Sequence, residues 1–415
     1  MIGSRLFQSR WWIVFAAFLG LTVSQGPIVA YSLSVFLKPV SEDLGVSRGT
    51  FSLAYNLDNL MCAVFIPIFG FLVDRYGVRR VLMPGIALFA LATAGLSYLQ
   101  SSSAVLFGLF ALQGVFSAAN TPTGYAKTIS AWFDRERGLT LGIAVAGTGF
   151  GVMLMPPAMT YLIQNYGWRD AYIGLGAALM VFAFVPVALF IQDPSSSHVP
   201  GRGAPADTAV GMSLGEAFKS AQFWTMTVTF FLVIVAVNGT LSHMIAMLTD
   251  RGIPLAIATT ALSAVGLAII VSRTGAGYLV DRFFAPYVAI VFFCCPIVGI
   301  TLLLSGASGA VPVVGAVLCG FGVGAEVDLM PFFIGRYCGL RAFGAIYGLT
   351  FGIFVAGVGV GGYLMGLYFD FNHSYTGMLI AFVGALAIAC LLITRLGPYR
   401  YPVAATAESL APVTA

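Results

Sequence analysis

Long apolar stretches, each ended by a short polar or charged segment, follow one another along almost the whole chain. A helix that crosses a lipid bilayer needs about 20 mostly apolar residues. Twelve stretches reach that length, and they cover residues 11–37, 51–73, 80–99, 104–131, 138–164, 170–191, 222–247, 255–280, 286–305, 311–335, 342–369 and 374–396. The pattern therefore predicts an all-α integral membrane protein with twelve transmembrane helices.

The longest polar interruption separates the sixth stretch from the seventh. It is rich in Pro, Gly, Ser and Ala, a composition typical of flexible linkers. We therefore expect an N-terminal six-helix bundle over residues 1–191, a cytoplasmic linker over 192–221, and a C-terminal six-helix bundle with its tail over 222–415. After the Pro- and Gly-rich segment and before the seventh stretch, LGEAFKSAQFW (214–224) has the pattern of a short amphipathic helix at the membrane surface.

The two halves repeat each other. GFLVDRYGVRR (70–80) ends the second stretch and GYLVDRF (277–283) ends the eighth, which places Asp74 and Asp281 207 residues apart. Gly138 and Gly344, after the fourth and tenth stretches, are 206 residues apart. Two landmarks with nearly the same period predict two pseudo-symmetric bundles. Parallel repeats around a substrate site near the middle of the membrane are typical of one class of transporter.

Composition excludes several functions. Of the 415 residues 59% are hydrophobic and 9% charged, against about 25% charged in soluble domains. The net charge of +4 includes no dense basic patch, so a nucleic-acid partner is not expected. The six cysteines form no C-x-x-C pair, and the glycine-rich stretches lack the lysine of a phosphate loop, so no cofactor is expected. A membrane-embedded enzyme would need a polar catalytic cluster or a soluble domain, and the linker provides neither.

Lysine and arginine counts predict the orientation, since cytoplasmic loops carry more of both. With both termini in the cytoplasm, fourteen lie inside: Arg5, Arg10, Arg75, Arg79, Arg80, Arg135, Arg137, Arg202, Lys219, Arg282, Arg336, Arg341, Arg395 and Arg400. Four lie outside, namely Lys38, Arg48, Arg169 and Arg251. The first apolar stretch is longer than the roughly 7–15 residues of a signal peptide. We expect a multi-pass protein of the plasma (inner) membrane, surrounded by lipid and monomeric.

The loop after the second stretch carries a motif of a known family. The pattern G-x-x-x-D-R-x-G-x-R-R is complete, and its residues are Gly70, Asp74, Arg75, Gly77, Arg79 and Arg80. By this motif and the duplicated halves, nearly the whole chain resembles the major facilitator superfamily. The resemblance implies that the motif is a conformational gate which does not touch substrate. Of the charged residues of this motif, the second half keeps Asp281 and Arg282.

Further features resemble the monocarboxylate-porter branch of that family, which includes oxalate/formate-type exchangers. They are AYSLSVFLKPVSEDLGVSR (30–48), WFDRERGLTLGIAVAGTGFG (132–151) and Arg273, eight residues before Asp281. The resemblance implies that Arg273 binds a substrate carboxylate. The sequence departs at Ile269, where family members often have an aspartate, and it has no second cation in YGLTFGIFVAGVGVGG (347–362). The missing cation disfavours a dicarboxylate substrate.

Arg273 is the charge that most needs an explanation, because an ionisable residue inside a membrane is costly and marks a functional site by default. Glu326 and Asp328, in the tenth stretch, should lie at a similar depth. They are two residues apart and point in different directions on a helix, so one of them is expected to meet the arginine. One interpretation is an ion pair that only stabilises Arg273. The other is a pair that a proton or a substrate displaces, with Glu326 or Asp328 as proton carrier.

Other polar residues within the stretches are weaker candidates. Asp58 lies near the outer end of the second stretch. It could be a second proton site, part of an outer gate, or a carboxylate exposed to water at the end of the helix. Tyr31, Asn120 and His243 are candidates for contact with substrate, and His243 could also titrate near neutral pH. Lys127 follows Asn120 at helical spacing and could reach the inner surface.

These observations together predict a secondary transporter of a small organic monocarboxylate, coupled to protons as a symporter and working by alternating access. Exchange of organic anions without net proton movement is one alternative. Proton-driven efflux of apolar or cationic compounds, with Glu326, Asp328 and Asp58 as acceptors, is another. A non-transporting sensor would bind the same ligands without moving them.

Overall fold

The computed structural model describes residues 10–133, 137–191, 211–280, 282–339 and 341–401. The first half contains α2 (Trp11–Thr22), η1 (Gly26–Ala30), α3 (Ser32–Leu44), α4 (Arg48–Tyr76), α5 (Val78–Gly95), η2 (Leu96–Tyr98), α6 (Ser103–Ser117), α7 (Pro122–Trp132), α8 (Arg137–Tyr166), α9 (Trp168–Leu179), η3 (Met180–Phe184) and α10 (Val185–Phe190). The second contains α11 (Leu214–Lys219), α12 (Ala221–Ser242), α13 (Met244–Asp250), α14 (Leu255–Val280), α15 (Ala285–Leu304), α16 (Val311–Tyr337), α17 (Phe343–Asn372) and α18 (Thr376–Thr394).

Across these ranges the fold is helical, as predicted, and the one β-type pairing is an isolated bridge between Gly211 and Gly339. Eleven helices in the described part of the chain are long and apolar enough to cross a membrane. The remaining predicted span, residues 104–131, corresponds to the shorter apolar helix α6 followed by α7. The predicted surface helix is α11, which begins with a capping box between Ser213 and Glu216.

Three of the predicted spans contain non-helical residues within the bundle, whereas the π-helix η3 continues the sixth span without a break. The first is divided into α2, the π-helix η1 and α3; the fourth breaks between Ser117 and Pro122; and the seventh breaks at His243. Breaks of this kind free backbone groups from the helical ladder, and membrane proteins tolerate them where neighbouring segments supply new partners. The breaks therefore mark places where side chains from other helices must reach in.

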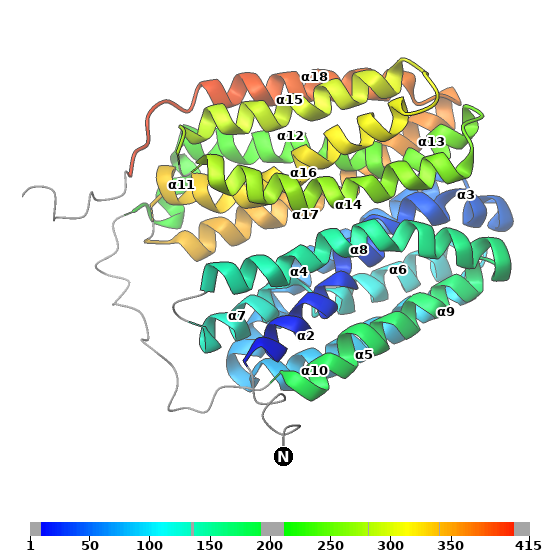
Figure 1. Ribbon diagram of the computed structural model, residues 1–415, viewed down its shortest axis with the longest axis horizontal. Helices are drawn as coiled ribbons and strands as arrows, with labels where there is room; N and C mark the ends of the chain where they lie inside the picture. Colours follow the sequence, from blue (N-terminus) through cyan, green and yellow to red (C-terminus); the bar gives the residue numbers. More distant parts are fainter. Residues whose placement is uncertain (1–9, 134–136, 192–210, 281, 340, 402–415) are drawn as a thin grey trace, which may run out of the picture.

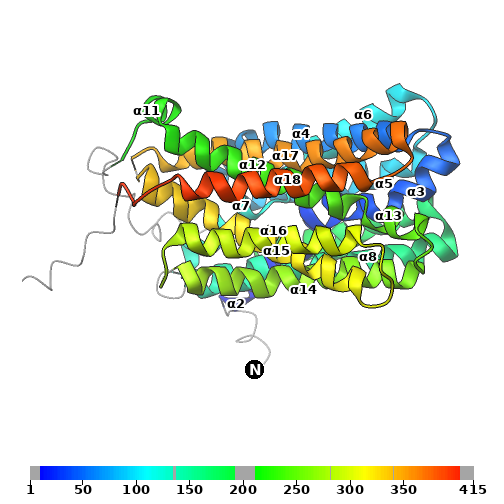
Figure 2. The same ribbon diagram turned by 90° about the horizontal axis from the view of Figure 1, so that it is seen from above.

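The two halves lie side by side in Figure 1, and in both Figure 1 and Figure 2 their helices run roughly along the long axis of the molecule. They touch through α8 against α14, α4 against α17, and α3 against α13. Where α8 crosses α14, a Cβ on Gly266 would overlap the backbone of Gly149 and Met153. Small residues allow membrane helices to approach this closely, so the glycines position the contact between the halves.

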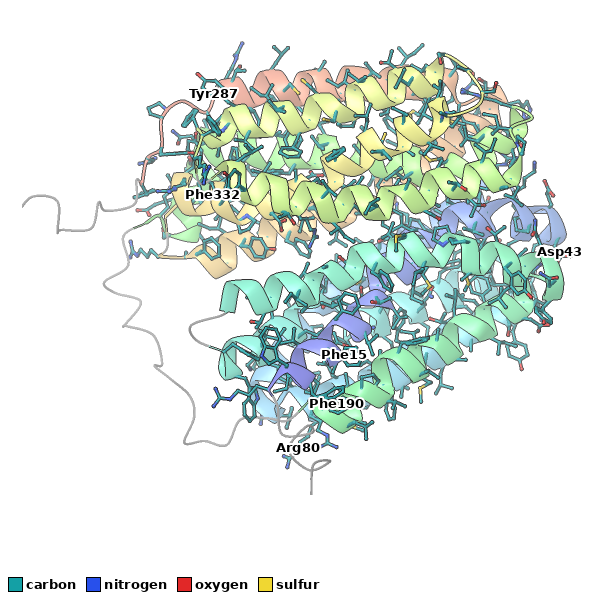
Figure 3. All side chains as sticks on the ribbon, in the orientation of Figure 1. Phe15, Asp43, Arg80, Phe190, Tyr287 and Phe332 are labelled. Atoms are coloured by element: carbon teal, nitrogen blue, oxygen red, sulfur yellow. The ribbon has the colours of Figure 1, made fainter. Side chains whose placement is uncertain are left out.

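The contact is uneven along the long axis. One end holds the start of α2 at Trp11, the end of α10 at Phe190 and the last described residue, Tyr401. We call it the termini end. At the opposite or far end, α3 and α13 bring the halves together, and Figure 1 shows α8 and α14 diverging from there towards the termini end. Figure 3 marks the far end by Asp43 and the termini end by Arg80, Phe190 and Phe332. This shape determines where a site between the halves can lie.

Candidate functional site: a cavity between the two halves

A cavity of about 610 Å³ lies between the halves. Its wall in the first half is the beginning of α8, and its wall in the second half belongs to α14 and α16. It is lined by Leu141, Gly142, Ile143, Val145, Ala146, Ile270, Arg273, Thr274 and Asp328. One wall is thus almost wholly apolar, while the opposite wall carries one cation, one carboxylate and one hydroxyl.

Arg273 is the cation of this cavity. It lies on α14 and is half-buried, and its Nε atom is buried without a hydrogen-bond partner in the described part of the chain. Among the ion pairs of the described residues, none involves Arg273. A buried guanidinium donor that lacks a partner is costly, and anions bind well to the planar guanidinium fork. The arginine therefore faces the cavity with hydrogen-bonding capacity to spare.

The two acidic residues of α16 have different surroundings. Asp328 lines the cavity and is close enough to Arg273 for the two charges to interact. Glu326 is fully buried, and neither of its carboxylate oxygens has a hydrogen-bond partner among the residues that the structure describes. Residues four apart share a face of a helix. Glu326 shares a face with Gly322, which packs on Pro296 of α15. Asp328 shares a face with Gly324, which packs on Ile269 of α14. The structure thus brings Asp328 and not Glu326 to the cavity.

Two tyrosines lie near this charged wall. Tyr31, where η1 meets α3, is buried and interacts electrostatically with Arg273. Tyr347 of α17 interacts electrostatically with both Arg273 and Asp328, and its ring stacks between Phe343 and Phe351 at centroid distances of 6.0 and 5.7 Å. Sequence reasoning did not single out Tyr347. Aromatic residues at a spacing of four on one predicted helix were the signal available.

Asn120 lies at the break between α6 and α7, where its side chain binds the broken first span. Its Nδ2 donates to the carbonyl oxygens of Gly20 and Val23 at 3.3 and 3.0 Å. Its Oδ1 accepts a hydrogen bond of 2.7 Å from the Tyr125 hydroxyl. The amide is fully buried and its donor and acceptor are both engaged, so in this conformation it holds two broken helices together outside the set that lines the cavity.

His243 and Asp58 are also buried away from the cavity lining. His243 contacts Ser52 of α4 and the carbonyl oxygen of Gly362 in α17, so it lies where the halves meet at the far end. Asp58 of α4 is fully buried, and within the described ranges neither of its carboxylate oxygens has a hydrogen-bond partner. It is therefore not a water-exposed carboxylate in this conformation. Next to it, the Asn59 side chain accepts a hydrogen bond from Gln25 at 3.1 Å.

The motif residues gather at the termini end of the first half. Gly77 has a φ of +93°, which suits glycine, and it separates α4 from α5. Arg75 lies over the Tyr76 ring, and Arg79 donates to the carbonyl oxygen of Ala188 at 2.6 Å. Arg80 is exposed. In the second half Arg282 lies 3.9 Å from the Tyr278 ring centroid. Asp281 and the side chain of Asp74 lie outside the described residues.

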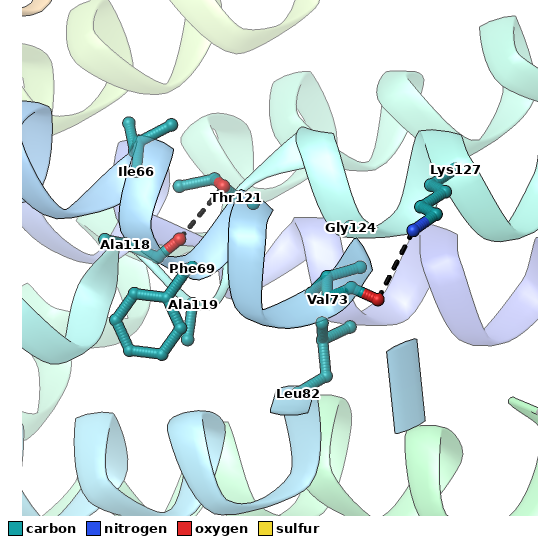
Figure 4. Close-up of a pocket in the computed structure, with 10 residues that line it drawn as sticks. Ile66, Phe69, Val73, Leu82, Ala118, Ala119, Thr121, Gly124 and Lys127 are labelled. Carbon is teal, nitrogen blue, oxygen red and sulfur yellow. Dashed lines mark hydrogen bonds between the residues drawn. The ribbon is translucent and has the colours of Figure 1, made fainter. Parts of the chain in front are cut away.

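A smaller cavity, of about 150 Å³, adjoins the motif (Figure 4). Gly70 and Val73 of α4 line it together with Thr121, Gly124 and Lys127 of the fourth span. The Lys127 ammonium donates to the carbonyl oxygen of Val73 at 3.3 Å, as Figure 4 shows. Lys127 thus connects the fourth span to the motif helix within the first half.

The far end carries a set of contacts that sequence reasoning missed. Arg48 donates to both carboxylate oxygens of Asp250, and Lys38 donates to the same carboxylate at 3.0 Å. The Asp370 carboxylate accepts from the Ser47 hydroxyl at 2.7 Å and from the Gly49 amide at 2.9 Å. We call these contacts the far-end clamp. From the sequence, Lys38 and Arg48 contributed only to the prediction of membrane orientation. Nothing in the local sequence indicates that their partners lie some 200 residues away.

Known proteins resemble this chain over most of its length. The family model of the Major Facilitator Superfamily matches residues 11–362. The oxalate:formate antiporter of Oxalobacter formigenes is 29% identical over 231 residues, which cover 55% of this chain and 53% of the antiporter. Monocarboxylate transporter 13 of Rattus norvegicus is 28% identical over 78% of this chain and 74% of its own.

A solved structure supports the same assignment at the level of fold. A bacterial homologue of the human lysosomal transporter Spinster, in an inward-facing and unoccupied conformation, superposes with a TM-score of 0.72. The match covers 93% of this chain and 96% of the other at 14% identity. The family match across the bundles, the helical architecture and the superposition agree, and the chain belongs to the major facilitator superfamily, a family of membrane transporters and not of enzymes.

Proposed function

We propose that the protein is a secondary active transporter of a small organic monocarboxylate, moved together with a proton by alternating access. The observation that carries this proposal is Arg273, a half-buried guanidinium that has no ion-pair partner among the described residues and faces a cavity between the halves. A carboxylate would satisfy its free donors, and the apolar wall on α8 would cover a short hydrocarbon body. One cation in the lining suits one carboxylate.

Asp328 is the proton-coupling group in this proposal. Its carboxylate lines the same cavity as Arg273, so an ionised Asp328 competes with the substrate for the guanidinium. Protonation removes that competition and favours binding, which couples the two fluxes. Glu326 and Asp58, both buried without hydrogen-bond partners among the described residues, are further proton sites. A negative charge at either position would have no hydrogen-bond donor. Each site would therefore carry its proton inside its own bundle and not in the cavity.

We further propose that both termini lie in the cytoplasm, which makes the far end the outer side of a plasma (inner) membrane. The charge count supports this orientation. The conformation is then closed outside by the far-end clamp, and the cavity lies towards the cytoplasm. The motif from Gly70 to Arg80, with Asp281 and Arg282, serves as the gate at the cytoplasmic end when the halves rock the other way.

Anion exchange is the second candidate, because the relative with the higher identity of the two named above is an oxalate:formate antiporter. The two modes differ in what must accompany the substrate. Symport acidifies the lumen of a proteoliposome as substrate enters, and needs no anion inside. Exchange proceeds only when a counter-anion is loaded inside, and does so at constant pH.

Binding of small monocarboxylates to purified protein tests the proposal, first with wild type and then with Arg273→Gln. The control is Arg395→Gln, which removes an exposed guanidinium of the same half outside the cavity lining and outside the gate. We expect Arg273→Gln to weaken binding at least about tenfold, or roughly 1.4 kcal/mol, and Arg395→Gln to leave it within about twofold. Unchanged binding or transport in Arg273→Gln would refute the assignment.

A further inference from the structure

His243 occupies the break between α12 and α13 and is fully buried. Its Nε2 atom lies 3.1 Å from the Ser52 hydroxyl of the first half and 3.0 Å from the carbonyl oxygen of Gly362. Its Nδ1 atom lies 3.4 Å from the hydroxyl of Tyr375. One imidazole therefore contacts α4 of the first half as well as α17 and the start of α18 in the second.

The contacts continue from His243 to the far-end clamp. The Tyr375 hydroxyl accepts a hydrogen bond of 2.6 Å from Nη1 of Arg48, and Arg48 also donates to Asp250. The Arg48 guanidinium lies 4.0 Å from the Phe369 ring centroid, and Phe369 stacks on Tyr375. A continuous chain of polar contacts thus passes between the halves at Ser52 and again at Arg48.

The donors and acceptors in this chain determine the protonation state that fits. The carbonyl oxygen of Gly362 can only accept, so Nε2 carries the hydrogen. In the neutral ring Nδ1 is then an acceptor and takes the hydrogen of the Tyr375 hydroxyl, whose oxygen accepts from Arg48. Every group has a compatible role. The neutral imidazole therefore completes the closed contact.

A protonated imidazole fits the same arrangement poorly. Both of its nitrogens would donate, so the Tyr375 hydroxyl would have to turn its hydrogen away from Nδ1, and its oxygen would have to accept from both Nδ1 and Arg48. The ring would also carry a positive charge close enough to Arg48 for repulsion. Neither nearby carboxylate can compensate, because Asp250 is bound to Arg48 and Lys38, and Asp370 to Ser47 and Gly49. Protonation therefore weakens the closure.

We propose that His243 is a proton-responsive switch of the far end: neutral, it keeps the two halves closed there, and protonated, it releases them. The inference rests on the proposed alternating access and orientation, in which the far end faces outside. External acid would then favour the outward-open form, the form that must load substrate and proton. His243 acts on the closure between the halves, whereas Arg273 and Asp328 act in the cavity.

The size of the effect follows from proton linkage. An imidazole in contact with water titrates near pH 6.5. If the open form binds the proton with that affinity and the closed form does not bind it, lowering the pH from 7.5 to 5.0 raises the ratio of open to closed molecules by about 30-fold. Such a change is large enough to convert a mostly closed population into a mixed one.

The distance between the halves at the far end measures this ratio directly. Spin labels at positions 166 and 307, which are exposed at that end of the two halves, report it in purified protein whose six cysteines are replaced by alanine. In labelled protein with His243 intact, we expect a short-distance population at pH 7.5 that loses share to a longer one at pH 5.0. In His243→Gln, which keeps a neutral side chain, the pH effect should disappear.

His373→Asn is the matched control, because His373 lies at the far end with a φ of +48° that asparagine tolerates. It should keep the full pH effect. Tyr375→Phe removes the partner of Nδ1 and should show a smaller pH effect than protein with Tyr375 intact. This variant tests the proposal if His243→Gln does not fold. The proposal is overturned if the labelled protein with His243 intact shows no pH effect, or if the pH effect persists in His243→Gln. It is also overturned if the effect vanishes in His373→Asn or remains at full size in Tyr375→Phe. No substrate is needed, so the result is independent of whether carboxylates bind at Arg273.

Discussion

Arg48 of α4 donates hydrogen bonds to both carboxylate oxygens of Asp250 of α13, so an ion pair joins the two halves of the molecule. The two residues are 202 positions apart in the chain. The side chain of Arg48 is 12% exposed and that of Asp250 is 26% exposed, which makes the pair better shielded from water than a surface salt bridge. It lies at the end where the halves meet, opposite the end where they diverge.

Removal of this ion pair should open the far end. In Arg48→Gln the Asp250 carboxylate keeps Lys38 but loses its bidentate partner, and the Tyr375 hydroxyl loses its donor. We expect a cost of about 1–2 kcal/mol to the closed form, between the values for exposed and buried pairs, or roughly a 5- to 30-fold rise in the ratio of open to closed molecules. Distances between spin labels at positions 166 and 307 measure it.

The control is Arg169→Gln. Arg169 pairs with Asp43 at 2.8 Å within the first half at the same end, and both side chains are about half exposed. Loss of that pair should leave the distance distribution unchanged. A similar shift in both variants would mean that general charge, and not the bridge between the halves, holds the far end closed.

Opening of the far end driven by the Asp250 carboxyl should need a lower pH than opening driven by His243. Burial raises the pKa of Asp250, but the hydrogen bonds from Arg48 and Lys38 outweigh it and leave the pKa below its ordinary value. A carboxyl whose pKa is depressed in the closed form stabilises that form above its ordinary pKa, and the contribution is lost as the pH falls through the depressed value. In His243→Gln the far end should therefore stay closed from pH 7.5 to 5.0 and open only below about pH 4.

That titration uses the same spin labels. In the double variant with His243→Gln and Asp250→Asn the low-pH transition should disappear, because no carboxyl remains to be protonated at that position, and the far end should be more open at every pH, because Arg48 has lost its ion-pair partner. A transition near pH 6 in His243→Gln would contradict the assignment of the two groups.

The crossing of α8 and α14 should be intolerant of a single methyl group. A Cβ on Gly266 would overlap the backbone of Gly149 and Met153, which cannot move as an isolated side chain can. We expect Gly266→Ala to destabilise this conformation by about 1–3 kcal/mol, the usual cost of overpacking, and to lower the melting temperature of the purified protein.

Gly275→Ala, on the same helix, is the control for that substitution. Its Cβ would meet Phe292 at 3.8 Å, an ordinary contact, and alanine is the better helix former. Its melting temperature should match or exceed that of wild type. Equal losses in the two variants would argue against a special role for the crossing.

Asp328→Asn and Glu326→Gln should separate the two acidic residues of α16. Without the Asp328 carboxylate, Arg273 has no anionic competitor in the cavity. Monocarboxylate affinity at neutral pH should then rise several-fold, and its dependence on pH should flatten. Glu326→Gln should leave the pH dependence of affinity as it is, because Glu326 is buried outside the cavity lining. Ligand affinity measured between pH 5 and pH 8 tests both, and the reverse pattern would assign coupling to Glu326.

Much of the architecture could be predicted from the sequence, because a bilayer imposes a simple rule on length and polarity. Apolar stretches of about 20 residues must be helices when no water is present to satisfy the backbone. The helices α4, α14 and α16 follow the predicted stretches with differences of a few residues at their ends. The repeated motif at Asp74 and Asp281 predicted two halves, and its specificity was sufficient to identify the family.

The tertiary structure decided which polar residues meet. Periodicity placed Glu326 and Asp328 at the depth of Arg273, but the packing of α16 against α14 and α15 turned Asp328 towards the cavity and Glu326 away from it. Asn120 and His243 were candidates for substrate contact by their position in the chain. In the fold they lie at breaks in the helices, where freed backbone groups and the opposite half supply their partners.

The sequence by itself determined the helices, the duplicated halves and the unusual charge at Arg273, since each depends on local composition or on spacing along the chain. The far-end clamp could not be read from it. Its pairs link residues about 200 to 320 positions apart, and such contacts arise only when two bundles, each folded on its own pattern, are placed against each other. Their relative position is set by close packing at points such as Gly149 and Gly266, and side-chain identity alone does not reveal it.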